Sequence, residues 1–309
     1  MTTTTRKLLF TIKSYEYLQP RLLAAGDFEQ GTIERKTFPD GERYLRITDD
    51  TRGRDVVLLG GTPTDLDALE VYDLGCALSS TGARSLSLVI PYFGYSTMER
   101  AVQPGEVVTA KTRARLFSAI PSCEGGTRVF LFDLHTDGIE YYFDDSHVTQ
   151  HIYGSSLITE AIRARMGEGG FVLGATDAGR AKWVQSLAEH LGVEPAFVYK
   201  RRDPASGNLK LTGINADVRG KPVMLYDDMI RTGSSLLQAG RAYLAAGATE
   251  VHALASHLVL PADSLAKLRS SGVFKSISGT DSHPGSEQIG DAGSVISIAG
   301  LLVSALSRT

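Results

Sequence analysis

The chain contains 309 residues, of which 42% are hydrophobic and 22% are charged, and these proportions are typical of an ordinary globular protein. This length exceeds what one hydrophobic core usually supports and predicts two domains of about 150 residues each. The net charge of −3 excludes a strongly basic protein, so we expect neither nucleic acid nor an anionic membrane as a partner.

Cysteine content and hydropathy predict the compartment. Cys76 and Cys123 have no metal-ligand spacing and are too few for a disulfide framework, which favours a reducing environment. The amino-terminal stretch lacks the apolar core of a signal peptide, and no apolar run approaches the ~20 residues of a membrane helix. We therefore expect a cytoplasmic protein.

The first half alternates short apolar runs with amphipathic segments. This order predicts strand–helix–strand units and an α/β fold with mainly parallel sheets flanked by helices, whose ligand loops follow the carboxyl ends of the strands. The turn Phe38-Pro39-Asp40-Gly41-Glu42 by itself indicates a hairpin tip. The expected strands are 7–12, 43–47, 55–60, 86–90 and 128–133, and the expected helices are 15–25, 67–82 and 109–116.

The same alternation restarts after Tyr153–Ser155, where we place the domain boundary. The domains are then 1–152 and 153–294, followed by a last strand and helix. The expected strands are 171–174, 249–256, 274–278 and 295–299, a further run of strand character begins at Val223, and the expected helices are 157–166, 181–191, 236–246, 265–271 and 300–306.

A phosphate site is predicted at Val223–Ser235. A buried strand ends in two adjacent carboxylates, Asp227 and Asp228, and a turn rich in small residues then opens a helix. Gly233 lets the backbone approach a ligand, while the nearby hydroxyls and the helix start bind an anion. The two carboxylates suit the vicinal hydroxyls of a ribose or an ion bridging to them. The residues that offer hydroxyls are Thr232, Ser234 and Ser235.

Two other loops carry charge. In Ala175–Arg180, Asp177 caps a helix start and Arg180 adds a cation, which predicts a second anion site. The three cations of Lys200–Arg202 precede a stretch rich in Pro, Ser and Gly, 203–208, and predict a mobile basic loop.

Three histidines follow the expected strand 128–133. His135 lies between Asp133 and Asp137, so it either helps to hold a divalent cation or is a loop histidine hydrogen-bonded to an aspartate. We expect His147 and His151 to be ordinary surface or interface histidines in a helix-like or turn segment.

The Asp227–Ser235 segment resembles the ribose-5-phosphate loop of phosphoribosyltransferases and of ribose-phosphate pyrophosphokinases, D-D-x-x-D/T-T-G-x-T/S. Other stretches resemble the pyrophosphokinases over nearly the whole chain. They are FPDGERY, PYFGY, GEVVTAK, DLHTDGIEYYFD, ATDAGR and KRRDP, and the turns Ser256-His257-Leu258 and Thr280-Asp281-Ser282 stand near two family turns. The resemblance, to a divergent member, implies two phosphoribosyltransferase-like domains, with 295–309 packing back on the first.

In that family, Mg²⁺-dependent enzymes transfer the diphosphoryl group of ATP to the anomeric hydroxyl of ribose 5-phosphate and release AMP. The resemblance implies a magnesium site at His135 and Asp177, and a homo-oligomer, dimer or hexamer, because the Phe38 loop reaches a neighbouring subunit. It assigns nucleotide binding to Phe38, Asp40, Glu42 and Arg100, and catalysis to Lys200, Arg202 and His135. It assigns the pyrophosphate loop to Asp177, Ala178, Gly179 and Arg180, and sugar-phosphate binding to Asp227, Asp228, Arg231, Thr232, Gly233, Ser234 and Ser235.

The chain departs from the family pattern in several places. Thr97 and Met98 replace an arginine and a glutamine that contact ATP, and Gly138, Thr176 and Arg180 replace a glutamine, a proline and a glycine. Arg231 replaces an acidic residue, so an acceptor with more phosphate, such as ADP-ribose, is one alternative. A non-catalytic regulatory homologue and a phosphoribosyltransferase are the others.

Overall fold

The computed structural model describes residues 6–176, 181–202, 209–290 and 293–308. The chain folds into two compact units. The first contains Met1–Tyr153 together with Ser297–Thr309, and the second contains Gly154–Ile296. Each unit has its own sheet and its own core.

The first unit is built on a parallel sheet with the strand order β2-β1-β5-β6-β7-β8. Its central strands are almost completely buried because helices cover both faces, as a parallel sheet requires. The predicted α/β class is confirmed. The strands are β1 (Lys7–Thr11), β2 (Phe28–Gln30), β5 (Asp55–Leu59), β6 (Ser85–Ile90), β7 (Thr127–Phe132) and β8 (Val148–Ile152).

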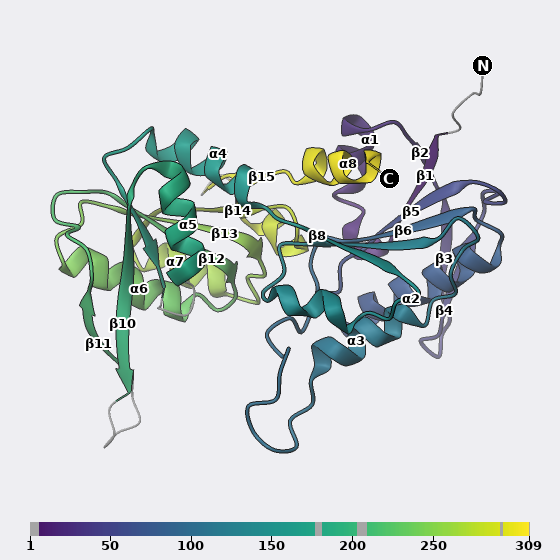
Figure 1. Ribbon diagram of the computed structural model, residues 1–309, viewed down its shortest axis with the longest axis horizontal. Coiled ribbons are helices and arrows are strands. Elements are labelled where there is room, and N and C mark those ends of the chain that lie inside the picture. The colour runs from purple at the N-terminus through teal and green to yellow at the C-terminus, as the bar shows by residue number, and fades with distance from the viewer. Residues whose placement is uncertain (1–5, 177–180, 203–208, 291–292, 309) are drawn as a thin grey trace. The chain divides into compact units, whose positions relative to one another are not determined.

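Helices α1 (Gln19–Ala25) and α8 (Ala299–Ser307) lie on one face of this sheet, and α2 (Asp65–Ser80) and α3 (Thr109–Ser118) lie on the other (Figure 1). The helix that we predicted from residue 15 begins later, after the short 3-10 turn η1 (Lys13–Tyr15). Pro20 explains the delay, since proline fits the first turn of a helix and breaks its interior.

A two-stranded antiparallel hairpin, β3 (Ile33–Thr37) and β4 (Arg43–Ile47), stands apart from the main sheet. A hairpin of this kind is marginally stable by itself. Here Arg35 and Arg43 each place a guanidinium nitrogen 3.2 Å from the carboxylate of Glu70 on α2, whose side chain is only 5% exposed. This buried carboxylate fixes the hairpin to the first unit.

The second unit has the strand order β11-β10-β9-β12-β13-β14-β15, in which only β10 and β11 are antiparallel among the described pairs. The strands are β9 (Val172–Ala175), β10 (Glu194–Arg202), β11 (Leu209–Ile214), β12 (Val223–Ile230), β13 (Val251–Leu258), β14 (Phe274–Thr280) and β15 (Val295–Ile296). The helices are α4 (Ser155–Met166), α5 (Ala181–Leu191), α6 (Ser234–Ala245), α7 (Ser264–Ser270) and the 3-10 turn η4 (Pro284–Gln288).

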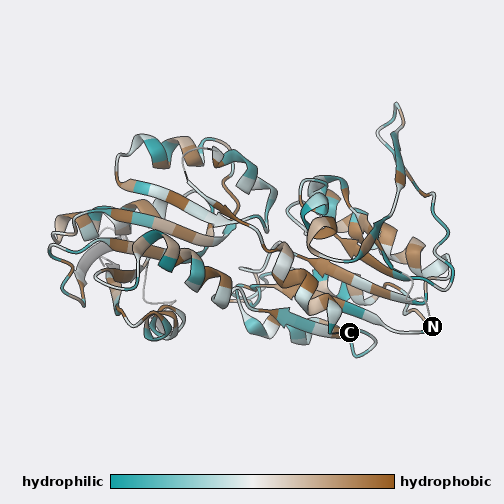
Figure 2. Ribbon diagram, turned by 90° about the horizontal axis from the view of Figure 1, so that it is seen from above, coloured by the Kyte–Doolittle hydropathy of each residue, from teal (hydrophilic) through white to brown (hydrophobic). Residues whose placement is uncertain are grey.

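Alternation along β12 divides the core of this unit between the two faces of the sheet. Val223 and Leu225 pack with Tyr243 of α6, whereas Met224 and Tyr226 pack in the cluster that contains residues of α4 and α5. The helices carry both hydrophobic and hydrophilic residues (Figure 2), as expected when one side faces a sheet.

Three strands of the second unit are longer than predicted. We ended them at the acidic pair and at residues 256 and 278, but they continue to Ile230, Leu258 and Thr280. The reason is cooperative pairing: β12 and β13 stay in register to Ile230 and Leu258, and β13 in turn pairs with β14. Polar residues that we placed in loops therefore lie inside strands.

Candidate functional site

The predicted sugar-phosphate loop lies where β12 turns into α6. Gly233 makes this turn with a φ angle of +73°, which residues with side chains rarely adopt. A Cβ atom here would also lie 2.7 Å from both methyl carbons of Leu268 on α7. Only glycine fits, because another residue would combine backbone strain with a steric clash.

Three exposed side chains with hydroxyl groups surround this turn. They belong to Thr232, Ser234 and Ser235, and Oγ1 of Thr232 lies 3.3 Å from Oγ of Ser234. No side chain caps the start of α6, so its first backbone N–H groups are available at the same turn. Hydroxyls and N–H groups at a helix start suit an anion such as a phosphate. Arg231, also exposed, adds a cation to the turn.

The acidic pair lies inside β12, three and two residues before its end. Asp228 is buried and Asp227 is half-buried. The Oδ2 atom of Asp227 accepts a 2.9 Å hydrogen bond from the hydroxyl of Thr176, and its Oδ1 atom accepts a 3.0 Å hydrogen bond from the backbone N–H of Asp228. Thr176 begins the segment that we predicted as the pyrophosphate loop, so the structure joins two loops that were separate in the sequence.

The residue before the acidic pair is firmly held. Tyr226 stacks on Trp183 of α5 with ring centroids 4.5 Å apart and planes 10° from parallel. Its hydroxyl lies 2.7 Å from Oγ of Ser256 on β13. Ala175, the residue before Thr176, is paired with Tyr226 in the sheet. These contacts fix the β9 and β12 ends against each other.

The segments around His257 and Ser282, to which we had assigned no role, form a buried polar cluster at the ends of β13 and β14. Nδ1 of His257 lies 2.7 Å from Oγ of Ser282, and the hydroxyl of Thr280 donates to the carbonyl of Ser256 at 2.5 Å. Burial and, next, the nearby His257 lower the pKa of His283 to about 4. The available sequence signal was polar residues inside otherwise apolar strands.

Several predicted residues of the second unit are described incompletely or not at all. Asp177, Ala178, Gly179 and Arg180 lie outside the described residues, as do 203–208. The backbone of Lys200 and Arg202 belongs to β10, so the predicted basic loop begins as a strand. A register shift between Tyr199 and Lys200 marks a β-bulge just before these cations.

His135 lies in the first unit, half-buried in the loop between β7 and the 3-10 turn η2 (Asp137–Tyr142). The loop begins at the buried Asp133, whose φ angle is +44°. The backbone N–H of Leu134 donates a 2.9 Å hydrogen bond to Nε2 of His151 on β8. Nδ1 of His151 lies 3.4 Å from the Asp137 carboxylate. His151 therefore contacts the His135 loop on both sides of that residue.

We predicted that His147 and His151 are surface or interface histidines, but the structure buries both within the first unit, so the prediction is wrong. His147 is 5% exposed, and the side chain of His151 is 4% exposed. The segment containing His151 is a strand, because β8 pairs with β7 along its length. Burial lowers the pKa of His151, against the neighbouring carboxylate of Asp137. Nε2 accepts a hydrogen bond, whereas Nδ1 lies 3.4 Å from the Asp137 carboxylate without a hydrogen bond to it.

The loop between β6 and α3 carries two of the departures from the family pattern, Thr97 and Met98. Tyr95 donates a 3.0 Å hydrogen bond to Asp65, and Arg113 of α3 forms a 2.6 Å ion pair with the same carboxylate. These two donors, Arg113 first, lower the pKa of Asp65. Thr97 and Met98 are exposed beyond this anchor. The side chain of Arg100 is 78% exposed and lies 3.4 Å from the carboxylate of Glu99.

Phe38, Asp40 and Glu42 lie at the tip of the β3–β4 hairpin, and all three are exposed. The tip is closed by the backbone N–H of Phe38, which donates to the carbonyl of Glu42 at 2.8 Å. Asp40 accepts a 3.1 Å hydrogen bond from the backbone N–H of Glu42. This ordered tip presents an aromatic ring and two carboxylates to solvent.

In the part of the chain that the structure describes, no three His, Cys, Asp or Glu side chains are arranged to hold a metal ion. Mg²⁺ usually needs only one or two protein carboxylates and completes its shell with water and substrate phosphates. The oxygen donors of Asp227 and Asp228 beside the phosphate turn, and those around His135, fit this mode. No helix in the described ranges combines the length and apolar character needed to cross a bilayer.

Comparisons with known proteins match both units. Residues 7–120 match the N-terminal domain of ribose phosphate pyrophosphokinase, and residues 164–276 match the phosphoribosyl transferase domain. The ribose-phosphate pyrophosphokinase of Campylobacter jejuni is 34% identical over 256 residues, covering 82% of this chain and 80% of the relative. That of Methanosarcina acetivorans is 33% identical over 294 residues, covering 95% and 96%.

The crystal structure of phosphoribosylpyrophosphate synthetase from Mycobacterium smegmatis superposes with a TM-score of 0.87 at 26% identity, covering 98% of each chain. The likeness thus extends through both units. The chain belongs to the ribose-phosphate pyrophosphokinase family.

Proposed function

We propose that this protein transfers the diphosphoryl group of ATP to the anomeric hydroxyl of ribose 5-phosphate. The observation that carries the proposal is the β12–α6 turn, in a chain whose relatives are named ribose-phosphate pyrophosphokinases. In this reaction the anomeric oxygen bonds to the β-phosphorus of ATP. The bond from that phosphorus to the oxygen bridging to the α-phosphorus breaks, AMP leaves, and the hydroxyl proton passes to solvent.

The acceptor is held by the second unit. The hydroxyls of Thr232, Ser234 and Ser235 and the N–H groups of the α6 start bind the 5-phosphate, with Gly233 allowing its close approach. Asp227 and Asp228 accept hydrogen bonds from the ribose hydroxyls. This clamp orients the anomeric hydroxyl, and orientation of the reacting groups is a large part of catalysis in phosphoryl transfer.

The donor nucleotide is bound through charged and aromatic groups. The exposed tip residues Phe38, Asp40 and Glu42 bind the base, and Arg100 contributes a cation. Lys200 and Arg202 on β10 stabilise the negative charge that builds on the transferring group. Because the hairpin tip projects into solvent, we propose that it serves the site of a neighbouring copy in a homo-oligomer.

We propose His135 and Asp177 as the residues that hold Mg²⁺, with Asp177 and the rest of its loop, Ala178, Gly179 and Arg180, at the pyrophosphate. When bound, the ion would supply positive charge that offsets the charge of the nucleotide phosphates. The contacts of His151 with the His135 loop, through Leu134 and Asp137, hold that loop in place for this role.

The test is AMP release from Mg-ATP by the purified protein, with ribose 5-phosphate, with ADP-ribose and with no acceptor. We expect AMP with ribose 5-phosphate only. Release of AMP with ADP-ribose but not with ribose 5-phosphate would identify ADP-ribose as the acceptor, the alternative that the substitutions at Arg231 and Arg180 suggest. No release with either acceptor would contradict the proposal and favour a non-catalytic homologue. A phosphoribosyltransferase would instead consume phosphoribosyl pyrophosphate in the presence of a base.

Variants of the turn make the test specific. Thr232→Val combined with Ser235→Ala removes two hydroxyls and should raise the KM for ribose 5-phosphate at least tenfold, since one hydrogen bond to a charged group is worth roughly 1.5–3 kcal/mol and about 1.4 kcal/mol corresponds to a factor of ten. The KM for ATP should change much less. Ser270→Ala, which removes an exposed hydroxyl on α7, is the matched control. Equal changes in both KM values would contradict the assignment of this turn to the sugar phosphate.

A further inference from the structure

A polar pocket lies at the amino-terminal edge of the first unit's sheet, opposite the strand ends that carry the His135 loop. Its cavity volume is about 280 Å³. Lys7 and Asp55 are the first residues of β1 and β5, and Arg128 is the second residue of β7. Sheet pairing brings these positions together, because Asp55 is opposite Ser85 and Ser87 is opposite Arg128. The pocket is therefore built by rigid strands of a single unit.

The charged groups that line the pocket carry a net positive charge. The lining contains three cations, Lys7, Arg84 and Arg128, and one carboxylate, Asp55, which leaves two positive charges in excess. The carboxylate of Asp55 already has partners within the chain, because Nε of Arg84 donates to it at 2.8 Å and the hydroxyl of Ser85 donates to it at 2.6 Å. The remaining positive charge belongs to Lys7 and Arg128.

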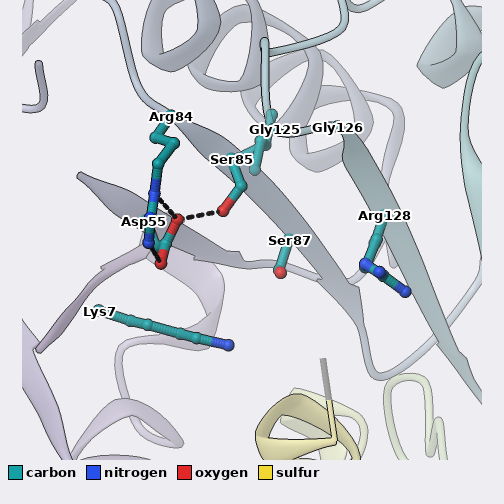
Figure 3. Close-up of a pocket in the computed structure, with 9 residues that line it drawn as sticks. Lys7, Asp55, Arg84, Ser85, Ser87, Gly125, Gly126 and Arg128 are labelled. Carbon is teal, nitrogen blue, oxygen red and sulfur yellow. Dashed lines mark hydrogen bonds and ion pairs between the residues drawn. The ribbon is translucent and has the colours of Figure 1, made fainter. Parts of the chain in front are cut away.

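The side chains of Lys7, Ser87 and Arg128 surround the remaining space, whereas Asp55 is joined to Arg84 and Ser85 (Figure 3). Ser87 is only 6% exposed, and neither it nor Arg128 has a hydrogen-bond or ion-pair partner among the described residues. Lys7 donates one hydrogen bond of 2.8 Å, to the carbonyl of Leu306 in the last turn of α8. Ser87 is thus a buried hydroxyl without a partner among the described residues, whereas Arg128 is exposed to solvent, and an acceptor that enters the pocket meets both donors.

Repulsion among the three cations also favours a bound anion in the pocket. Burial is the main cause that lowers the pKa of Lys7, and Arg128 and Arg84 lower it further, whereas Asp55 raises it. A negative group placed among these cations would offset the repulsion and supply acceptors for the unused donors.

We propose that this pocket binds a phosphate group, either as inorganic phosphate or on a small phosphorylated molecule. Phosphate carries close to two negative charges and several acceptor oxygens, which match the two excess cations and the hydroxyl of Ser87. The cavity is at the lower limit of the ~300–1,000 Å³ typical of small-molecule sites, so the ligand is small. The site is separate from the sugar-phosphate turn, which belongs to the other unit.

Binding of radiolabelled inorganic phosphate, measured by equilibrium dialysis of the full chain at constant ionic strength, tests the proposal. The sugar-phosphate turn is itself expected to bind phosphate, so the decisive quantity is the number of sites. We expect Arg128→Gln to remove one site or weaken it at least tenfold, and Ser87→Ala to weaken the same site several-fold. Both substitutions should leave the unfolding curve without phosphate nearly unchanged, because neither side chain has a partner to lose.

The matched control is Arg115→Gln, which removes an exposed arginine of α3 in the same unit. If this control loses the same binding, or if Arg128→Gln and Ser87→Ala keep every site, the proposal is overturned. Repeating the experiment with labelled glycerol 3-phosphate distinguishes the two sources. If the two ligands compete, the pocket recognises the phosphate group itself. If only glycerol 3-phosphate binds, and Arg128→Gln removes that binding, the pocket recognises a phosphorylated metabolite.

Discussion

The hydroxyl of Thr176 donates a 2.9 Å hydrogen bond to Oδ2 of Asp227. Thr176 is 3% exposed and follows β9, while Asp227 lies in the neighbouring strand β12. A proline, which the family pattern has at this position, could not form this bond because it has no side-chain donor. The departure from the family pattern at residue 176 thus provides a donor that helps to orient the Asp227 carboxylate.

Thr176→Val should therefore impair the use of ribose 5-phosphate. The protein should stay folded, because valine has nearly the same shape as threonine and is well tolerated in a buried position. Loss of the hydrogen bond removes one of the contacts that orient the Asp227 carboxylate, and we expect kcat/KM for this acceptor to fall about fivefold to tenfold. Thr176→Ser should restore most of it. Steady-state kinetics with varied acceptor measure both effects, with the exposed Thr249→Val as control. Identical kinetics of Thr176→Val and wild type would show that the bond has no such role.

Gly233→Ala tests the turn of the sugar-phosphate loop. The added methyl group meets Leu268 at 2.7 Å and forces alanine to a φ angle of +73°. We expect a loss of unfolding free energy of about 2 kcal/mol or more, with lower affinity for ribose 5-phosphate. Gly220→Ala is a close control, since Gly220 has the same φ angle and open space around its Cβ position. It should show only the backbone cost of roughly 1 kcal/mol. Equal losses in urea unfolding of the two variants would exclude the steric contribution.

Glu70→Gln tests how the hairpin is attached. The buried carboxylate loses its charge while two arginines stay beside it, so we expect a loss of roughly 1–3 kcal/mol of stability. Faster amide hydrogen exchange should appear in β3 and β4 before the main sheet is affected. Glu34→Gln, which breaks only ion pairs with the exposed Lys36 and Arg46, should cost much less stability than Glu70→Gln. A hairpin that exchanges at the wild-type rate in Glu70→Gln would contradict this attachment.

His283 predicts a pH dependence of stability. Its pKa of about 4 in the folded protein lies below the ordinary value of 6.5, so between these values the unfolded chain binds a proton that the folded chain does not. The contribution of His283 to the free energy of unfolding is therefore fully present above pH 6.5. It is lost as the pH falls towards 4, and the loss is on the order of 3 kcal/mol. Nδ1 of His283 accepts a 2.9 Å hydrogen bond from the backbone N–H of Gly285, which an asparagine side chain can replace. His283→Asn should make the pH dependence of urea unfolding shallower in this range, and an unchanged slope would refute the prediction.

Local sequence patterns were sufficient to predict most helices and the presence of most strands. Apolar runs identified β5, β6 and β7, and helical spacing identified α2 and α6, because burial on a sheet requires that periodicity. They did not predict β8 or the full length of β12, since a strand ends where its neighbour stops pairing, and that neighbour is distant in the sequence.

The sequence by itself determined the chemistry available at the sugar-phosphate turn: the acids, the glycine and the hydroxyls follow one another along the chain, so local geometry brings them together. Only the tertiary structure decided which distant residues accompany them. Thr176 reaches Asp227 because β9 lies beside β12, and His151 reaches the His135 loop because β8 lies beside β7. Strand order is set by the packing of whole elements, and no short stretch of sequence encodes it.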